Sequence, residues 1–408
     1  MHYKRQLIDN LYYIGGNDRR LSRFENMFTL PEGVSYNSYL LLDEKTVLFD
    51  GIDHAVVQEH IEGVRTVLGD RPLDYFIIHH VEPDHCDSIN AIMQLYPDVK
   101  IVISKRGLTF LKQFYPDAAL LNIDYDTSAH IVDEGDTLDI GSRELTFITA
   151  PNVHWPEVFM TYDSKDKILF SADAFGSFKA IEGHLFSDQV DYACKWMDEA
   201  RRYYINIVGR QGAAVQKVLK KAAGLDIEMI LPLHGLCHRT PEMISLMLEK
   251  YNAWSSYEPE EDGVVILYSS MYGNNHKVAD TLAGMLADRN VPAIAVHDVS
   301  GSDVGVMIAD MFRYSNAVIF GMNYNTELYP RMDALLREAA MLNFSNRKVS
   351  YVAAMSWGGR GLAIAREILG NCKNITEVGE PVTIKSAATY EQIDELKVLA
   401  DSIAETFK

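Results

Sequence analysis

The stretch Ile77–Asp87, IIHHVEPDHCD, places three histidines, one glutamate and two aspartates within nine residues. It overlaps the end of the apolar run LDYFII, which predicts a buried strand. Imidazole and carboxylate groups are the side chains that bind zinc, iron and other transition metals. So dense a cluster at the end of a strand predicts a metal site.

Further candidate ligands follow other predicted strands. The apolar runs ELTFITA, KILFSA and IEMILPL are followed by His154, Asp173 and His234, respectively. Loops at strand ends, backed by a sheet, hold functional side chains rigidly. Four imidazoles and three carboxylates exceed the needs of one tetrahedral ion and suit two metals that share a bridging carboxylate. The full candidate set is His80, Glu82, Asp84, His85, His154, Asp173 and His234.

His79 is expected to differ from its neighbour His80. Successive side chains of a strand point to opposite faces, so the two imidazoles cannot serve one site. We therefore expect His79 to have a structural role or to support a metal ligand without binding the metal itself. A histidine or aspartate of this kind, met alone, would more often be a core or capping residue, and the combination of all the strand ends is what favours metal binding.

The length of 408 residues predicts two domains rather than one. The segment SSYEPEEDG (255–263) contains four acids, a proline and a glycine, which is typical of a linker. We expect a strand-rich domain over 1–254 and a second domain over 264–408. Within the first, helical patterns are expected around 88–96, 191–223 and 241–253.

Charge and cysteine usage exclude several classes of protein. A net charge of −19 disfavours binding to nucleic acid or to an acidic membrane, because both require a basic surface. No apolar run has the length of a membrane span or the form of a signal peptide, so a cytoplasmic protein is expected. The four cysteines form no C-x-x-C pair, which excludes a zinc ribbon, a rubredoxin-type site and a disulfide framework.

The second domain alternates strands with helices, as an open, doubly wound parallel sheet of flavodoxin size does. Its first strand, VVILY, leads into a Ser/Asn-rich loop at the start of a helix, a place that binds phosphate. The loop is neither a Walker motif nor G-x-G-x-x-G, which favours a phosphate monoester, hence FMN. Its candidate contacts are Ser269, Ser270, Met271, Tyr272, Gly273, Asn274 and Asn275.

Two later strands of this domain end in loops that should meet the first one. In an open parallel sheet, ligands bind at the carboxyl ends of the strands near the switch point. The candidate flavin contacts in these loops are Asn323, Tyr324, Asn325, Ser356, Trp357, Gly358 and Gly359. We expect Tyr324 and Trp357 to flank the isoalloxazine ring.

The anchor His80-x-Glu82-x-Asp84-His85, with the spacing of the later ligands, resembles the metallo-β-lactamase-like domain of the flavodiiron proteins. Zinc hydrolases of that fold usually have His-x-His-x-Asp-His. A carboxylate in place of the second histidine suits iron better than zinc. The resemblance covers nearly the whole chain. It implies an α/β and α+β protein, a metallo-β-lactamase-like αββα sandwich followed by a flavodoxin-like doubly wound parallel sheet.

The resemblance also implies the division of the ligands. His80, Glu82 and His154 would bind one iron, Asp84, His85 and His234 the other, with Asp173 as the bridge.

The sequence departs from the family pattern in three places. The interval between His85 and His154 is longer than expected, Asp87 stands where glycine is usual, and Gly321–Asn325 replaces Ser-Pro-Thr-Tyr-Asn.

A flavodiiron protein would reduce O₂ to water and/or NO to N₂O at two irons, with electrons relayed through one FMN. The chain has no rubredoxin-like C-x-x-C pairs, so we expect a separate donor: rubredoxin, reduced F420 or an NADH-linked reductase. The resemblance further implies a head-to-tail homodimer or a dimer of dimers. Two alternatives remain open: a zinc hydrolase fused to a flavodoxin-like module, and a non-catalytic FMN electron carrier.

Overall fold

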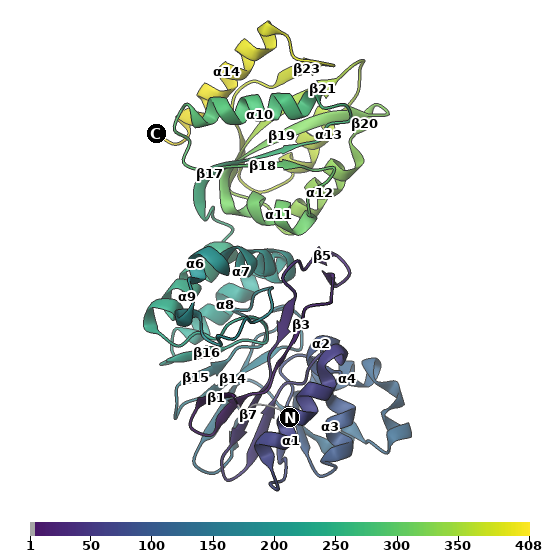
Figure 1. Cartoon of the computed structure of the whole chain (residues 1–408), viewed down its shortest axis with the longest axis vertical. Coiled ribbons are helices and arrows are strands. Elements are labelled where there is room, and N and C mark those ends of the chain that lie inside the picture. The colour runs from purple at the N-terminus through teal and green to yellow at the C-terminus, as the bar shows by residue number, and fades with distance from the viewer. Residues whose placement is uncertain (1–4) are drawn as a thin grey trace. The chain divides into compact units, whose positions relative to one another are not determined.

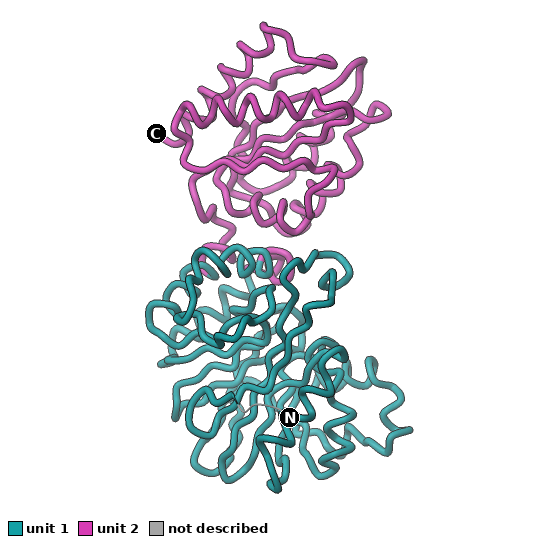
Figure 2. The backbone as a smooth tube through the Cα atoms, in the orientation of Figure 1, with its two compact units in different colours: residues 1–204, 213–251 teal, residues 205–212, 252–408 magenta. Residues whose placement is uncertain are grey.

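The computed structural model describes residues 5–408 and divides them into two compact units (Figure 2). Unit 1 consists of the described part of 1–204 together with 213–251, and unit 2 of 205–212 and 252–408. The chain leaves α9 (Pro241–Ser255) and enters β17 (Glu261–Tyr268) within the acidic segment expected to be a linker. Among residues 5–408, no helix is long and apolar enough to cross a membrane.

Unit 1 contains two large sheets (Figure 1). The seven-stranded sheet has the order β1-β2-β7-β8-β9-β10-β11 and the five-stranded sheet the order β12-β13-β14-β15-β16. The strands of the first are β1 (Arg5–Ile8), β2 (Leu11–Tyr13), β7 (Tyr39–Leu42), β8 (Thr46–Phe49), β9 (Tyr75–Ile77), β10 (Lys100–Ser104) and β11 (Ala129–Val132). Those of the second are β12 (Thr137–Asp139), β13 (Glu144–Thr149), β14 (Phe159–Asp163), β15 (Ile168–Phe170) and β16 (Met229–Leu231).

The two sheets pack face to face. Phe49 of β8 and Phe170 of β15 stack with ring centroids 3.8 Å apart and planes 5° from parallel, and both rings are buried. On its other face the seven-stranded sheet is covered by α1 (Val57–Leu68), α3 (Ile89–Leu95) and α4 (Lys105–Phe114), through an apolar core that includes Phe76 and Ile101. Burial of apolar surface between these layers stabilises the sandwich and fixes the strand ends that carry the candidate ligands.

The helical region expected over 191–223 is broken in the structure. It contains α6 (Tyr192–Lys195), α7 (Met197–Tyr203), a π-helical turn (Tyr204–Val208), a 3₁₀ turn (Gly209–Gln211) and α8 (Gly212–Ala222). One break falls at the buried Trp196, whose backbone (φ −130°, ψ −26°) is not helical, and the π-helical turn begins at the buried Tyr204. The helices expected around 88–96 and 241–253 are confirmed as α3 and α9.

Unit 2 is a doubly wound parallel sheet, as expected. Its strand order is β18-β17-β19-β21-β22, with β23 also paired to β21, and all these pairs are parallel. Besides β17 the strands are β18 (Ile294–Asp298), β19 (Tyr314–Tyr324), β21 (Arg347–Met355), β22 (Ile375–Glu377) and β23 (Val382–Lys385). The helices are α10 (Asn274–Ala287), α11 (Val304–Arg313), α12 (Pro330–Met341), α13 (Gly361–Gly370) and α14 (Tyr390–Glu405).

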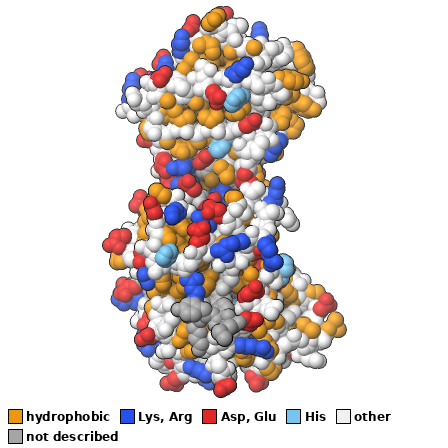
Figure 3. Space-filling view, in the orientation of Figure 1, with side chains coloured by type: hydrophobic (Ala, Val, Ile, Leu, Met, Phe, Trp, Pro, Cys, Tyr) orange, Lys and Arg blue, Asp and Glu red, His pale blue; other side chains and the backbone are white. Residues whose placement is uncertain are grey.

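The order of strand addition reverses at this point, because β18 lies on one side of β17 and β19 on the other, so the loops after β17 and β19 border a crevice. A core containing Val264, Leu282 and Leu396 binds the sheet to α10 and α14. On the face of the molecule shown in Figure 3, acidic and basic side chains are interspersed among apolar ones.

Candidate functional site

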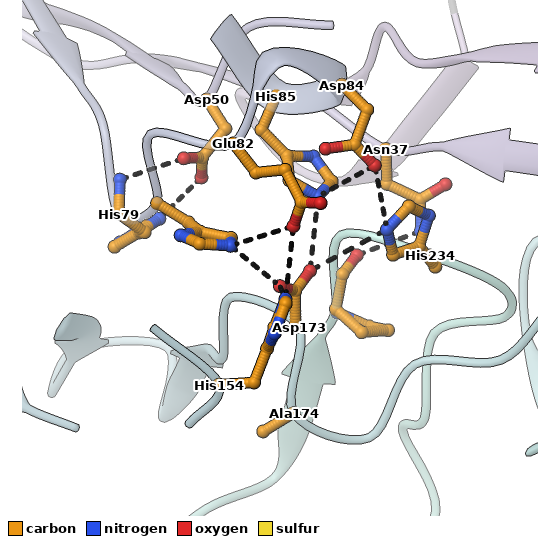
Figure 4. Close-up of polar contacts among 12 residues, drawn as sticks. Asn37, Asp50, His79, Glu82, Asp84, His85, His154, Asp173, Ala174 and His234 are labelled. Carbon is orange, nitrogen blue, oxygen red and sulfur yellow. Dashed lines mark hydrogen bonds and ion pairs between the residues drawn. The ribbon is translucent and has the colours of Figure 1, made fainter. Parts of the chain in front are cut away.

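The seven candidate ligands meet at one edge of the unit 1 sandwich (Figure 4). β15 and β16 are parallel neighbours, with Leu169 paired to Ile230, so their carboxyl ends deliver Asp173 and His234 to the same place. Pro83 begins the short helix α2 (Pro83–Cys86), and this turn brings Asp84 and His85 back toward the strand end.

Asp173 lies between two groups of side chains. Its Oδ2 is 3.4 Å from His80 Nε2 and 3.3 Å from His154 Nε2. Its Oδ1 is 3.1 Å from His85 Nε2 and 3.7 Å from His234 Nε2. One carboxylate therefore presents a different oxygen to each group.

Each group is closed by a second carboxylate. Glu82 Oε2 lies 3.1 Å from Nε2 of both His80 and His154. Asp84 Oδ2 lies 3.5 Å from His85 Nε2 and 3.4 Å from His234 Nε2. Separations of this size between ligand atoms suit an ion held at roughly 2.0–2.2 Å from each.

Several ligand atoms of the cluster have no hydrogen-bond partner within residues 5–408, as expected of a metal site. Both carboxylate oxygens of Asp84 and Asp173, and both ring nitrogens of His85, are buried without a hydrogen-bond partner among the described residues. Buried polar atoms left unpaired cost free energy, so a native site of this kind requires another partner. Two divalent cations would neutralise the three carboxylates of Glu82, Asp84 and Asp173 and leave a small net positive charge.

In unit 2 the three loops that follow β17, β19 and β21 surround a pocket of about 270 Å³. Polar groups of Ser270, Asn274 and Asn275 line it at the start of α10, where Gly273 adopts a left-handed conformation (φ 85°). The exposed rings of Tyr272 and Trp357 stand at its rim. A pocket with a helix N-terminus and aromatic walls suits a ring system that carries a phosphate.

Comparisons with known proteins identify the family of the chain. The family model described as ODP family beta lactamase matches residues 34–235. The chain is 31% identical over 356 residues to the anaerobic nitric oxide reductase flavorubredoxin of Vibrio vulnificus, covering 86% of this chain and 70% of that protein. A similar protein of the same name in Klebsiella pneumoniae is also 31% identical, with 71% of it covered.

Solved structures extend the similarity over the whole length of the chain. The rubredoxin oxygen:oxidoreductase of Desulfovibrio gigas superposes with a TM-score of 0.88 and 26% identity, covering 99% of this chain and 98% of that one. The flavodiiron protein of Giardia intestinalis gives the same TM-score and 25% identity, with coverage of 99% and 97%. The chain belongs to the flavodiiron protein family. It is therefore an oxidoreductase that uses FMN and a pair of irons.

The electrostatics of this flavodiiron protein's ligand cluster are those of a site built around cations. Burial alone would lower the pKa of His80, but Asp173, Glu157 and Glu82 raise it well above its ordinary value. Burial would raise the pKa of Asp173, yet His85 and His80 hold it well below the usual range. Burial raises the pKa of Asp84 to about 8. Bound cations would replace these protons, because a cation favours carboxylate and neutral imidazole.

Several supporting residues carried no signal in the sequence. Glu157 Oε1 accepts a hydrogen bond from His80 Nδ1 at 2.7 Å, and the Ser35 carbonyl accepts one from His234 Nδ1 at 2.8 Å. Asn37, which lies beside His234 (Figure 4), donates to the carbonyls of Pro232 and Gly235 and so fixes the loop around His234. Partners of this kind orient the imidazoles, but their spacing along the chain is irregular.

His79 points away from the cluster, as expected. Its Nδ1 lies 2.5 Å from Asp50 Oδ2 and its Nε2 lies 2.7 Å from Thr161 Oγ1. All three side chains are buried. His79 therefore ties β9 to the loop after β8 and to β14 of the other sheet.

The pocket in unit 2 is lined by most of the expected flavin contacts, with some differences. Ser269, Gly273 and Gly359 are not among the lining residues, and the Ser269 side chain is buried. Lining residues that the sequence analysis did not include are Met322, Thr326, Ala354, Met355, Ile384 and Ser386. Ile384 lies in β23 and Ser386 directly follows it. The alternating sequence VTIK of this strand could have been used to predict it.

Proposed function

We propose that this protein reduces O₂ to water and/or NO to N₂O at its iron pair, with electrons relayed through FMN from an external donor. The observation that carries the proposal is the position of Asp173, whose two oxygens face two separate groups of ligands. That arrangement suits two ions about one bridging carboxylate, and Glu82 gives one of them the additional anionic ligand that favours iron.

Each iron would be held by three residues and by Asp173. His80, Glu82 and His154 form one group, with a ligand atom from each within reach of one point. Asp84, His85 and His234 form the other. All seven side chains are largely buried, which limits the access of bulk water.

The residues around the unit 2 pocket would bind FMN. The loop before α10 would hold the phosphate with its backbone N–H groups and with Ser270, Asn274 and Asn275. Tyr324, Trp357 and Gly358 would contact the ring system. FMN supplies two electrons and a ferrous pair supplies two more, so four electrons and four protons convert O₂ to two waters.

For NO, two molecules with two electrons and two protons yield N₂O and one water. The similar proteins of Vibrio vulnificus and Klebsiella pneumoniae are named nitric oxide reductases, and that of Desulfovibrio gigas an oxygen:oxidoreductase. These names support both substrates for the present chain. The seven ligands and their spacing provide the same pair of iron positions for either reaction.

The electron donor is proposed to be a separate molecule: a rubredoxin, reduced F420 or an NADH-linked reductase. The name of the Desulfovibrio gigas protein supports rubredoxin. We further propose a head-to-tail homodimer, alone or as a dimer of dimers, in which the FMN of one chain serves the irons of the other. Closed two-fold symmetry would form two such contacts at once.

The test is turnover of the reduced protein, under anaerobic conditions, with O₂ and with NO in parallel. Metal and flavin analysis of the same sample should give about two irons and one FMN per chain. Consumption of either gas at catalytic rates supports the proposal. If the protein instead contains stoichiometric zinc and shows no turnover after iron is restored, the alternative of a zinc hydrolase would be favoured. The carboxylate ligand Glu82 argues against that alternative.

A further inference from the structure

Unit 1 brings together a second set of potential metal ligands, Asp53, His54 and Asp87, which we name the 53–87 cluster. Each offers one ligand atom, and these atoms all lie within 4.8 Å of one another. His54 Nδ1 is 3.2 Å from Asp53 Oδ1 and 3.5 Å from Asp87 Oδ2. The cluster shares no residue with the seven ligands around Asp173.

These separations fit a small divalent ion. Zinc binds imidazole nitrogen and carboxylate oxygen at roughly 2.0–2.2 Å, so two ligands at the tetrahedral angle lie about 3.4 Å apart. The separations of 3.2 Å and 3.5 Å from His54 fall on either side of that value. The His54 side chain is 81% exposed, which leaves room for water to complete the coordination.

The cluster also has little positive charge. The side chains of Asp53 and Asp87 are 15% and 22% exposed, and the buried Asp18 adds a further negative charge that acts on Asp53. Within residues 5–408, no lysine or arginine forms an ion pair with any of these three aspartates. His54 is the one group of the cluster that can carry positive charge, against three carboxylates, and a bound cation would offset the remaining cost of burying them.

The aspartates are already oriented. Asp87 Oδ1 accepts a hydrogen bond from the Tyr115 hydroxyl at 2.7 Å, which leaves Oδ2 facing His54. Asp53 Oδ1 accepts from the backbone N–H of Ala55 at 2.8 Å, where it caps the turn His54–Val56. A metal could therefore bind without rearrangement of either carboxylate.

We propose that the 53–87 cluster binds one zinc-class divalent ion, separate from the iron pair. Asp53 and His54 begin the turn that precedes α1, whereas Asp87 ends α2, which carries Asp84 and His85. The same two segments are joined by the hydrogen bond from Gly51 N to the His85 carbonyl, 2.7 Å long. The ion strengthens this connection and has a structural role.

The test is equilibrium dialysis of the iron- and FMN-loaded protein against Zn²⁺, with zinc and iron both counted by mass spectrometry. One additional zinc per chain, at unchanged iron, is expected. His54→Gln should weaken zinc binding at least about tenfold, the loss that follows removal of a supporting partner at metal sites. Asp87→Asn should act similarly while it keeps an acceptor for Tyr115.

His276→Gln is the matched control. His276 is also an exposed histidine beside a carboxylate, 3.3 Å from Asp280, but it belongs to no set of three ligands among the described residues. This variant should bind zinc as the wild type does. Zinc should raise the unfolding temperature of the wild type and not that of His54→Gln. Equal zinc binding by the wild type and both cluster variants, or zinc uptake only with loss of iron, would overturn the proposal.

Discussion

Oδ1 of Asp173 lies 3.1 Å from Nε2 of His85, while Oδ2 of the same carboxylate faces His80 and His154. No other residue of the cluster belongs to both ligand groups by distance. The pairing of the two metal positions therefore depends on Asp173 more than on any single histidine.

Asp173→Ala should abolish reductase activity and remove most of the iron, because two cations would face each other without the shared carboxylate. FMN should remain bound, since its pocket lies in unit 2. Iron analysis, the flavin absorbance spectrum and turnover with both gases check this. Wild-type iron content and turnover would mean that Asp173 is only a strand-end residue.

Glu157→Gln should lower iron affinity by about tenfold while leaving all seven ligands in place. The substitution removes the charge that the His80 imidazole faces at 2.7 Å, so His80 becomes a weaker ligand. Iron retention during dialysis against a chelator measures the effect. Glu144→Gln, at the exposed start of β13, is the control and should retain iron normally. Equal retention in both variants would contradict a supporting role for Glu157.

His79→Leu should reduce the free energy of unfolding by roughly 2–4 kcal/mol, because Asp50 and Thr161 lose a buried partner. Its iron content should stay at the wild-type level, since His79 points away from the cluster (Figure 4). Urea denaturation and metal analysis of one preparation test both parts. A loss of iron without a loss of stability would show that His79 acts as a ligand.

The convergence of the candidate ligands was predictable because each lies at or shortly after the end of an apolar strand, and these ends share one edge of the sandwich. The supporting groups were not. Glu157 and Asn37 act across the interface between sheets or loops that are distant in sequence. The backbone carbonyl of Ser35 could not be predicted as a partner of His234, because every residue has such a carbonyl whatever its side chain.

The helical prediction over 191–223 is confirmed as a series of short helices, but the breaks between them were not predicted. The residues of this segment have helical periodicity, whereas the backbone leaves the helical conformation at the buried Trp196 (φ −130°, ψ −26°), which separates α6 from α7. Local propensity could not reveal this packing. In unit 2, by contrast, regular alternation of strands and helices was sufficient to predict an open parallel sheet, although β22 and β23 were not predicted.

Gly359→Ala should weaken FMN binding, although Gly359 does not line the pocket. An added Cβ would lie 2.2 Å from Asn323 Nδ2, and the Asn323 side chain also accepts a hydrogen bond from Gly361 N at 2.7 Å. Overpacking of about 1–3 kcal/mol here would displace the loop that carries Trp357, for a loss of about tenfold or more in affinity. Gly284→Ala in α10, where an added Cβ meets nothing within 4 Å, is the control. Flavin fluorescence titration compares the two.

The proposed dimer can be tested with mixed pairs of chains, because unit 1 holds the metal ligands and unit 2 the flavin pocket. If electrons pass from the FMN of one chain to the irons of the other, an Asp173→Ala chain paired with an FMN-deficient chain should keep one working site. A chain with both defects, paired with a wild-type chain, should keep none. Turnover of purified, differently tagged pairs measures this. Half of wild-type activity in the second pair would show that electrons pass within one chain and would refute the head-to-tail arrangement.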